Sequence, residues 1–125
     1  MKVPAVQGGL LKGVAALMIL AELIDGSKCG YEINSTISRR LGTSLPPGYV
    51  YVMLRHLESK GFVKSEPLPN GVRRKRTYSV TEEGLTFLLE HEDKIDRLLS
   101  VLSYIKSTMA SAKSLSLNRF NSLEA

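Results

Sequence analysis

The sequence predicts a mainly α-helical protein with a small β-hairpin. Three observations lead to this fold class. Apolar residues recur at helical spacing in four segments of the 125-residue chain. An Asn-Gly pair at residues 70–71 separates two short strand-like segments, and this pair is a strong hairpin signal. Glycine or proline stands at the ends of most of these segments and marks their limits. The length suits one domain with a modest core.

The first predicted helix spans residues 10–23. Apolar side chains lie on almost every side of it, so we expect it to be largely buried. Asp25 and Gly26 end it. A second helix is predicted over residues 31–41, where apolar residues again recur at helical spacing, and Gly42 ends that helix.

The third predicted helix runs from about residue 47 to residue 60, because proline is tolerated in the first turn of a helix. One of its faces is apolar and should face the core. The opposite side carries Tyr49, Arg55 and His56, and Tyr51 lies at the margin between the two faces. Gly61 ends the helix.

The two predicted strands of the hairpin cover residues 62–67 and 72–80. Four consecutive cations lie at the start of the second strand. Side chains alternate along a strand, so no more than two of the four should point the same way. One face of the second strand should carry Arg74, Arg76, Tyr78 and Val80, and the other Arg73, Lys75, Thr77 and Ser79.

A fourth helix is predicted from Thr81, a good N-cap, to about residue 109 or beyond. Apolar residues at alternating spacings of three and four form a coiled-coil seam along it. This seam consists of Ile95, Leu98, Leu102, Ile105 and Met109. A monomer of this size would expose the seam, so we expect a homodimer. The serine-rich residues 111–125 are expected to form a frayed helix end or flexible tail.

This element order predicts a winged helix-turn-helix, in which the second and third helices form the helix-turn-helix and the hairpin is its wing. We therefore divide the chain into a DNA-binding domain at residues 1–80, a C-terminal dimerisation helix at residues 81–110 and a flexible tail at residues 111–125. The wing could lay its cations along phosphates that the third helix alone cannot reach.

The charge distribution supports a polyanionic partner. The net charge is +5, yet residues 1–80 hold 12 Lys and Arg against 5 Asp and Glu, whereas residues 81–110 hold 3 against 6. An α-helix fits the major groove of DNA, and Arg or His can donate to guanine. The candidate groove-reading residues are Tyr49, Tyr51, Arg55 and His56, and the candidate phosphate contacts on the wing are Lys64, Arg73, Arg74, Lys75 and Arg76.

Two of these assignments have structural alternatives. One or both tyrosines could pack under the wing, and this is nearly as well supported for Tyr51 as a base contact. The wing cations could be solvated side chains that protect a strand edge from aggregation. Arg39 and Arg40, at the end of the second helix, could bond its last carbonyls or touch phosphate, and the sequence does not choose between these roles.

Other classes of protein find little support in the residues. His56 and His91 have no partners at metal-ligand spacing, Gly8 and Gly9 lack the spacing of a dinucleotide-binding loop, and no nucleophile has a recognisable base beside it. We therefore expect neither an enzyme nor a bound cofactor. The longest apolar run is too short to cross a bilayer, and a single cysteine, Cys29, cannot form an intrachain disulfide. These features predict a cytoplasmic protein.

Three stretches of the chain resemble the PadR-like family of winged-helix transcriptional regulators. They are GYEI at residues 30–33, PPGYVYVMLRHLESKGFV at residues 46–63 and RKRTYSVTEEG at residues 74–84. The corresponding family patterns are roughly GYEI, SxGTLYPxLRRLExxGLV and RRKYYxLTExG. The chain departs from them at Tyr49, Val50, Val52 and Thr77. The resemblance covers about residues 10–90.

The resemblance implies a winged-helix DNA-binding domain and a single C-terminal helix that dimerises. Members of the family commonly act as repressors, and some bind small aromatic effectors near the dimer interface. Aromatic residues are scarce in the C-terminal helix of this chain, so a small-molecule effector has no support from the residues.

The sequence therefore favours a homodimeric, sequence-specific regulator that binds double-stranded DNA and represses transcription. Two alternatives remain open. One is an architectural protein that coats DNA with little sequence preference, and the other is a winged-helix module that binds another protein.

Overall fold

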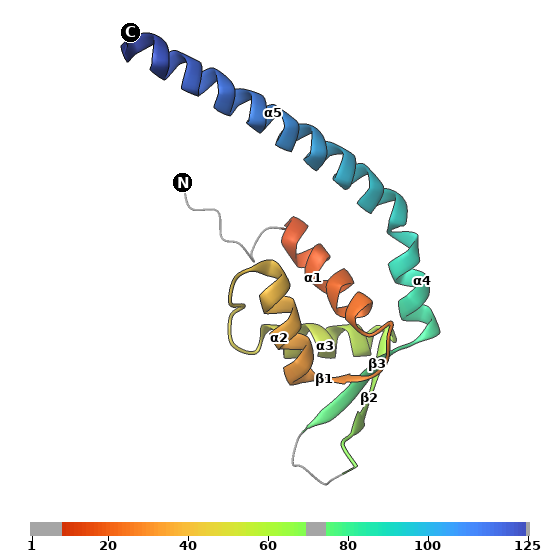
Figure 1. Cartoon of the computed structure of the whole chain (residues 1–125). Coiled ribbons are helices and arrows are strands. Elements are labelled where there is room, and N and C mark those ends of the chain that lie inside the picture. The colour runs from red at the N-terminus through yellow and green to blue at the C-terminus, as the bar shows by residue number, and fades with distance from the viewer. Residues whose placement is uncertain (1–8, 70–74, 125) are drawn as a thin grey trace. The chain divides into compact units, whose positions relative to one another are not determined.

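The computed structural model describes residues 9–69 and 75–124 (Figure 1). These residues form two compact units, one that ends at Leu89 and one that begins at Glu90. The structure confirms the predicted class, a mainly helical winged helix-turn-helix with a long C-terminal helix. Within the described residues, no helix combines the length and the apolar character needed to cross a membrane.

Three helices form the core of the first unit: α1 (Gly9–Glu22), α2 (Gly30–Leu41) and α3 (Tyr49–Ser59). They lie together on one side of a small sheet (Figure 1). The apolar face predicted for the third helix is buried as expected. The buried core consists of Ile19, Leu20, Leu23, Ile33, Ile37, Val50, Met53, Leu54, Leu57, Val63 and Tyr78.

The connection between α2 and α3 depends on two glycines with positive φ. Gly42 adopts φ 70° at the end of α2, and Gly48 adopts φ 80° directly before α3. The amide of Tyr49 bonds the carbonyl of Pro46 at 3.1 Å, so the two prolines form a turn and not the first helical residues. The third helix therefore begins at Tyr49, two residues later than the sequence predicts, because left-handed Gly48 interrupts the helical backbone.

The wing is a three-stranded antiparallel sheet with the order β1-β3-β2. Its strands are β1 (Lys28–Cys29), β2 (Val63–Pro67) and β3 (Arg76–Val80). The sequence predicts β2 and β3 but misses β1, because two residues are too few to show strand periodicity. Central β3 pairs with both neighbours, so that Tyr78 lies between Lys28 and Ser65.

Helix α4 (Glu82–Glu90) is anchored to the end of the sheet. The hydroxyl of Thr81 donates to the carbonyl of Gly61 at 2.6 Å and accepts the amide of Gly84 at 3.1 Å, which confirms the predicted N-cap. The rings of Phe62 and Phe87 stack with their centroids 4.4 Å apart. These contacts fix the start of α4 on the first unit.

The C-terminal helix differs from the prediction in two respects. A turn at His91 separates α4 from α5 (Glu92–Glu124), where one continuous helix was expected. Glu92 and Asp93 stabilise the N-terminus of a new helix through its dipole. In addition, residues 111–124 are helical, where a frayed end or flexible tail was expected. Residues 92–124 contain no glycine or proline, so no helix-breaking residue interrupts α5. The functional division of the chain after residue 80 remains a prediction.

Candidate nucleic-acid interface

The outer face of α3 presents two polar side chains to solvent. Arg55 and His56 are exposed, while Met53, Leu54 and Leu57 on the opposite side are buried in the core. Burial of this apolar face fixes the rotation of the helix and directs Arg55 and His56 outward. These two predicted groove-reading residues are therefore positioned as the sequence indicates.

Tyr49 does not belong to this exposed set. It is half-buried and packs against the core, and its hydroxyl is enclosed without a hydrogen-bond partner among the described atoms. Its position in the first turn lets the ring turn inward beside the apolar face. This burial argues against the predicted base contact of Tyr49.

Tyr51 combines features of the two roles that the sequence leaves open, because it is partly exposed to solvent and partly packed. Its side chain is 43% exposed, and its ring covers Gly30 so closely that a β carbon on Gly30 would overlap it. The GYEI stretch therefore has a glycine, Gly30, at the point where the Tyr51 ring of α3 crosses the start of α2. Tyr31, in the same stretch, is largely exposed and does not pack between the helices.

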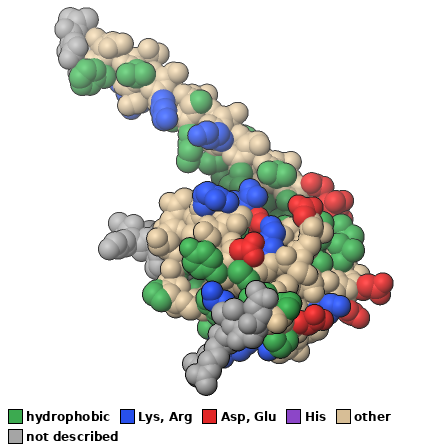
Figure 2. All heavy atoms as spheres, turned by 60° about the horizontal axis from the view of Figure 1, so that its bottom comes forward, with side chains coloured by type: hydrophobic (Ala, Val, Ile, Leu, Met, Phe, Trp, Pro, Cys, Tyr) green, Lys and Arg blue, Asp and Glu red, His purple; other side chains and the backbone are tan. Residues whose placement is uncertain are grey.

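The described part of the wing is cationic on its surface. Lys64 of β2, Lys75 and Arg76 are exposed, whereas the predicted contacts Arg73 and Arg74 lie outside the described residues. Figure 2 shows Lys and Arg side chains at the lower edge of this face and others along the C-terminal helix. The exposed cations Lys64, Lys75 and Arg76 agree with the basic character predicted for the wing.

A chain of hydrogen bonds joins α3 to both long strands of the wing. Arg76 donates through Nε to the hydroxyl of Ser65 at 2.8 Å and through Nη2 to the Ser65 carbonyl at 3.3 Å. Ser65 in turn donates its hydroxyl and its amide to Glu58 Oε2, at 2.7 and 3.1 Å. No pattern in the sequence predicts this role of Ser65. Its only signal was a small polar residue on the strand that follows the helix.

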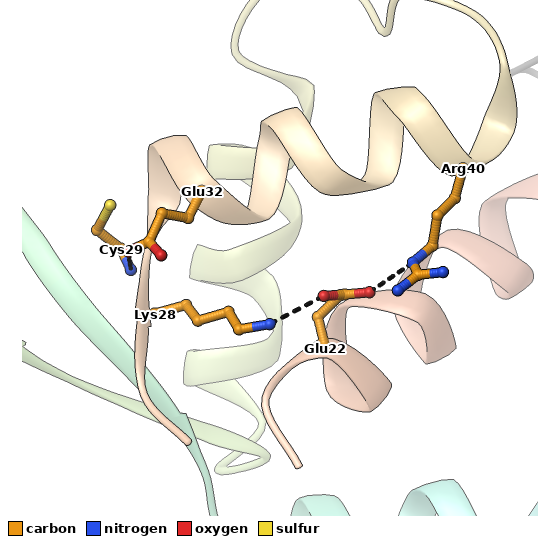
Figure 3. Close-up of polar contacts among 5 residues, drawn as sticks. All are labelled: Glu22, Lys28, Cys29, Glu32 and Arg40. Atoms are coloured by element: carbon orange, nitrogen blue, oxygen red, sulfur yellow. Dashed lines mark hydrogen bonds and ion pairs between the residues drawn. The ribbon is translucent and has the colours of Figure 1, made fainter. Parts of the chain in front are cut away.

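A second polar cluster joins the ends of the first two helices (Figure 3). The Glu22 carboxylate, with 10% of its side chain exposed, accepts from Lys28 Nζ at 3.0 Å and from Arg40 Nε at 2.7 Å. Burial alone would raise the pKa of Glu22, but the hydrogen bonds from Lys28 and Arg40 outweigh it and lower the pKa below its ordinary value. Arg40 therefore pairs with Glu22. This role differs from both roles considered for Arg40, which were a bond to the last carbonyls of the helix and a contact with phosphate.

The start of α2 carries its own polar contact. The Glu32 carboxylate turns back to accept the amide of Cys29 at 3.2 Å (Figure 3). The hydrogen bonds from Cys29 lower the pKa of Glu32. Cys29 is half-buried at the N-cap of α2, a position that suits a small packed side chain.

Helix α5 presents apolar side chains along its length. Of the predicted seam, Leu102, Ile105 and Met109 are exposed, and Ile95 and Leu98 are half-buried. Leu102 retains 53% of its surface and lines an open groove together with Ile105 and Met109. Among the described residues, no group of histidine, cysteine and carboxylate side chains could hold a metal ion.

Comparison with known proteins gives the family. The family model described as "Transcriptional regulator PadR-like family" matches residues 19–90, which is more than half of the chain. The chain belongs to the PadR-like family. The matched residues include α2, α3, the described wing and α4. The family is one of transcriptional regulators, in agreement with the expectation that the chain is not an enzyme.

One curated relative is described as a transcriptional activator. This PadR-like chain is 30% identical over 93 residues to the transcriptional activator GvpE of Haloferax mediterranei, an alignment that covers 74% of this chain and 45% of GvpE. The chain spans less than half the length of the curated relatives that it matches.

Solved structures agree on the fold. A crystal structure of a protein described as a transcriptional regulator, from Thermoplasma acidophilum, matches with 29% identity and a TM-score of 0.71, over 82% of this chain and 97% of that one. Bacillus subtilis PadR in complex with operator DNA matches with 28% identity and a TM-score of 0.54, over 62% of this chain and 46% of that one.

Proposed function

We propose that this PadR-like protein is a homodimeric transcriptional regulator that binds double-stranded DNA. The observation that carries the proposal is the orientation of α3. Its apolar face is buried in the core, and Arg55 and His56 point outward from the same domain that carries the exposed wing cations Lys64, Lys75 and Arg76. A helix with exposed donors can read base edges, while cations on a neighbouring wing hold the phosphates.

The comparison with Bacillus subtilis PadR supports DNA as the partner, because that relative was crystallised with operator DNA. That relative is 28% identical to this chain over a match that covers 62% of it. Transfer of the function to this chain remains part of the proposal. Non-specific affinity would come from counterion release by Lys64 and the four wing cations from Arg73 to Arg76.

The homodimer is proposed from the exposed apolar residues of α5. A second copy of the chain could cover Leu102, Ile105 and Met109, which a lone protomer leaves in water. A symmetric dimer would present two copies of α3 to successive major grooves, about 34 Å apart on B-DNA.

Repression is the proposed mode of action, because a dimer bound over a promoter can block the polymerase without any additional protein. The relative GvpE is described as an activator, so a reporter assay must decide the direction of regulation. A fall in reporter expression on adding the protein supports repression, and a rise shows activation. We also propose that the protein acts in the cytoplasm, where its DNA target would be.

The decisive experiment is a salt titration of binding to two duplexes, the upstream region of the chain's own gene and a scrambled control. Preferential binding to the upstream duplex, weakening as salt rises, would support a sequence-specific regulator. Equal binding to both duplexes would favour an architectural DNA-coating protein. Absence of binding to either duplex at low salt would leave the protein-interaction module as the better proposal.

A further inference from the structure

One apolar side chain lies in the middle of the outward face of α3. Val52 is 59% exposed. Among the described residues, it belongs neither to the buried core nor to the apolar side chains that pack against that core. The buried residues of α3 lie on the other side of the helix and are Val50, Met53, Leu54 and Leu57. Core packing is therefore not the reason for an apolar residue at this position.

Helix stability does not account for Val52 either. Valine is a poorer helix former than alanine, lysine or glutamate, because its branched side chain loses rotational freedom in a helix. The PadR-like pattern has proline at this position, so the valine is a departure specific to this chain. An exposed apolar residue that supports neither the core nor the helix is available for a contact outside the protein.

The direction of the Val52 side chain is fixed by the helix. Its amide donates to the carbonyl of Gly48 at 3.0 Å, so the residue is held in the helical backbone. A β-branched side chain in a helix adopts mainly one χ1 rotamer, which gives its methyl groups a defined direction. Such a rigid side chain loses little conformational entropy when it makes a contact. Val52 can therefore offer a preorganised apolar surface.

Val52 occupies the part of the helix that faces bases in helix-turn-helix proteins. It is the fourth residue of α3, and the N-terminal part of a recognition helix contacts the base edges. Arg55 and His56 follow one turn later on the same outward face. Residues three or four apart on a helix have Cβ atoms about 5–6 Å apart, so the three side chains can face neighbouring base pairs.

The chemistry of Val52 differs from that of the two polar residues. Arg55 and His56 recognise hydrogen-bond acceptors on base edges. Thymine also presents a methyl group in the major groove, and this group makes apolar contacts with protein side chains. The other three bases present only polar groups there, and an apolar side chain would leave those groups without a hydrogen bond. Val52 is thus suited to thymine.

We propose that Val52 contacts the methyl group of a thymine in the major groove and makes that base part of the recognised sequence. The inference rests on the proposed DNA binding. It adds a residue that determines specificity through apolar contact, which neither Arg55 nor His56 can provide.

The test compares the upstream duplex with the same duplex in which deoxyuridine replaces every thymine. Deoxyuridine pairs with adenine as thymine does and lacks only the methyl group. The full wild-type chain should bind the deoxyuridine duplex about threefold to fivefold more weakly for each contacted thymine, which is the effect of one buried methyl group. Single replacements along the duplex then locate the thymine.

Val52→Ala completes a double-mutant cycle. It should weaken binding to the thymine duplex by a similar factor, and it should bind the thymine and deoxyuridine duplexes equally well because the contact is already lost. Alanine is the better helix former, so the variant should fold at least as stably as wild type. Val52→Ile keeps a branched apolar side chain and should keep the preference for thymine.

Ile24→Ala is the matched control. Ile24 is an apolar residue outside α3 that is 47% exposed, so its truncation removes a comparable apolar surface. This variant should discriminate between the thymine and deoxyuridine duplexes as wild type does. Loss of discrimination by Ile24→Ala as well as by Val52→Ala would show a general effect of apolar truncation and would overturn the assignment.

Three further outcomes separate the possible failures. If the wild-type protein binds no duplex at all, the proposed function itself fails. If it prefers the upstream duplex to the scrambled control but binds the thymine and deoxyuridine forms equally, only the methyl contact fails. If Val52→Ala retains the full preference for thymine, another side chain contacts the methyl group and the role of Val52 is refuted.

Discussion

Gly84 in the first turn of α4 lies directly against the backbone carbonyl of Phe62. A β carbon on Gly84 would overlap that carbonyl oxygen and would lie 2.9 Å from Val80 Cγ2. The carbonyl also accepts the amide of Thr81 at 3.1 Å, so it cannot move without breaking the bond at the helix start. This close approach seats α4 on the end of the sheet.

Gly84→Ala should therefore destabilise the first unit. We expect a loss of about 1–3 kcal/mol in the free energy of unfolding, because steric overlap with a fixed carbonyl outweighs the better helix propensity of alanine. Urea denaturation followed by circular dichroism measures this change. Gly13→Ala in α1 is the matched control, since a β carbon there meets no atom within 4 Å, and it should be neutral or slightly stabilising. Equal stability of Gly84→Ala and wild type would contradict the close approach.

The Glu22 cluster should make stability depend on pH. The folded pKa of Glu22 is below its unfolded value, so its contribution is fully present above the unfolded value and is lost as the pH falls through the folded one. Glu22→Gln should cost about 1–2 kcal/mol at neutral pH, and its difference from wild type should shrink in acid. Urea midpoints across the acidic range measure both effects.

Glu66→Gln is the control for that experiment, because Glu66 is exposed on β2. It should leave both the neutral-pH stability and its pH dependence close to wild type. A Glu22→Gln difference that stays constant at every pH would show that the carboxylate charge contributes nothing and that only packing is disturbed.

Arg55→Ala should reduce sequence preference. If Arg55 donates to a base edge, its loss should weaken binding to the preferred duplex by about 1–3 kcal/mol and leave binding to a scrambled duplex nearly unchanged. Fluorescence anisotropy with the two duplexes gives the ratio of affinities. Arg76→Ala provides the contrast, because loss of a phosphate contact should weaken both duplexes alike. Equal weakening by Arg55→Ala would assign Arg55 to the backbone.

Leu102→Glu should abolish the proposed homodimer. A charge in the middle of the apolar face of α5 would have to be buried at the interface, which costs far more than a hydrophobic contact supplies. Sedimentation equilibrium should show a monomer for this variant and a dimer for wild type. Ser100→Glu, on the opposite side of the same helix, is the control and should remain dimeric. A wild-type monomer at all concentrations would refute the dimer without reference to any variant.

The sequence by itself determined most of the local organisation of this protein. Helix periodicity and terminal glycines correctly placed α1, α2 and α3 to within two residues, and the Thr81 side chain correctly marked the start of α4. The same periodicity separated the buried face of α3 from exposed Arg55 and His56. These features depend on neighbours within a few residues, so a linear pattern records them.

Tertiary structure alone decided which distant groups meet. The short strand β1 exists because β3 offers it an edge, and the turn of Tyr49 toward the core depends on the surface available beside it. Two sets of polar contacts join elements whose relation cannot be read from the periodicity of the sequence. One set runs from Glu58 through Ser65 to Arg76, and the other joins Glu22 to Lys28 and Arg40. Such contacts form when packing brings separate backbones within hydrogen-bonding distance, so they appear only in the folded chain.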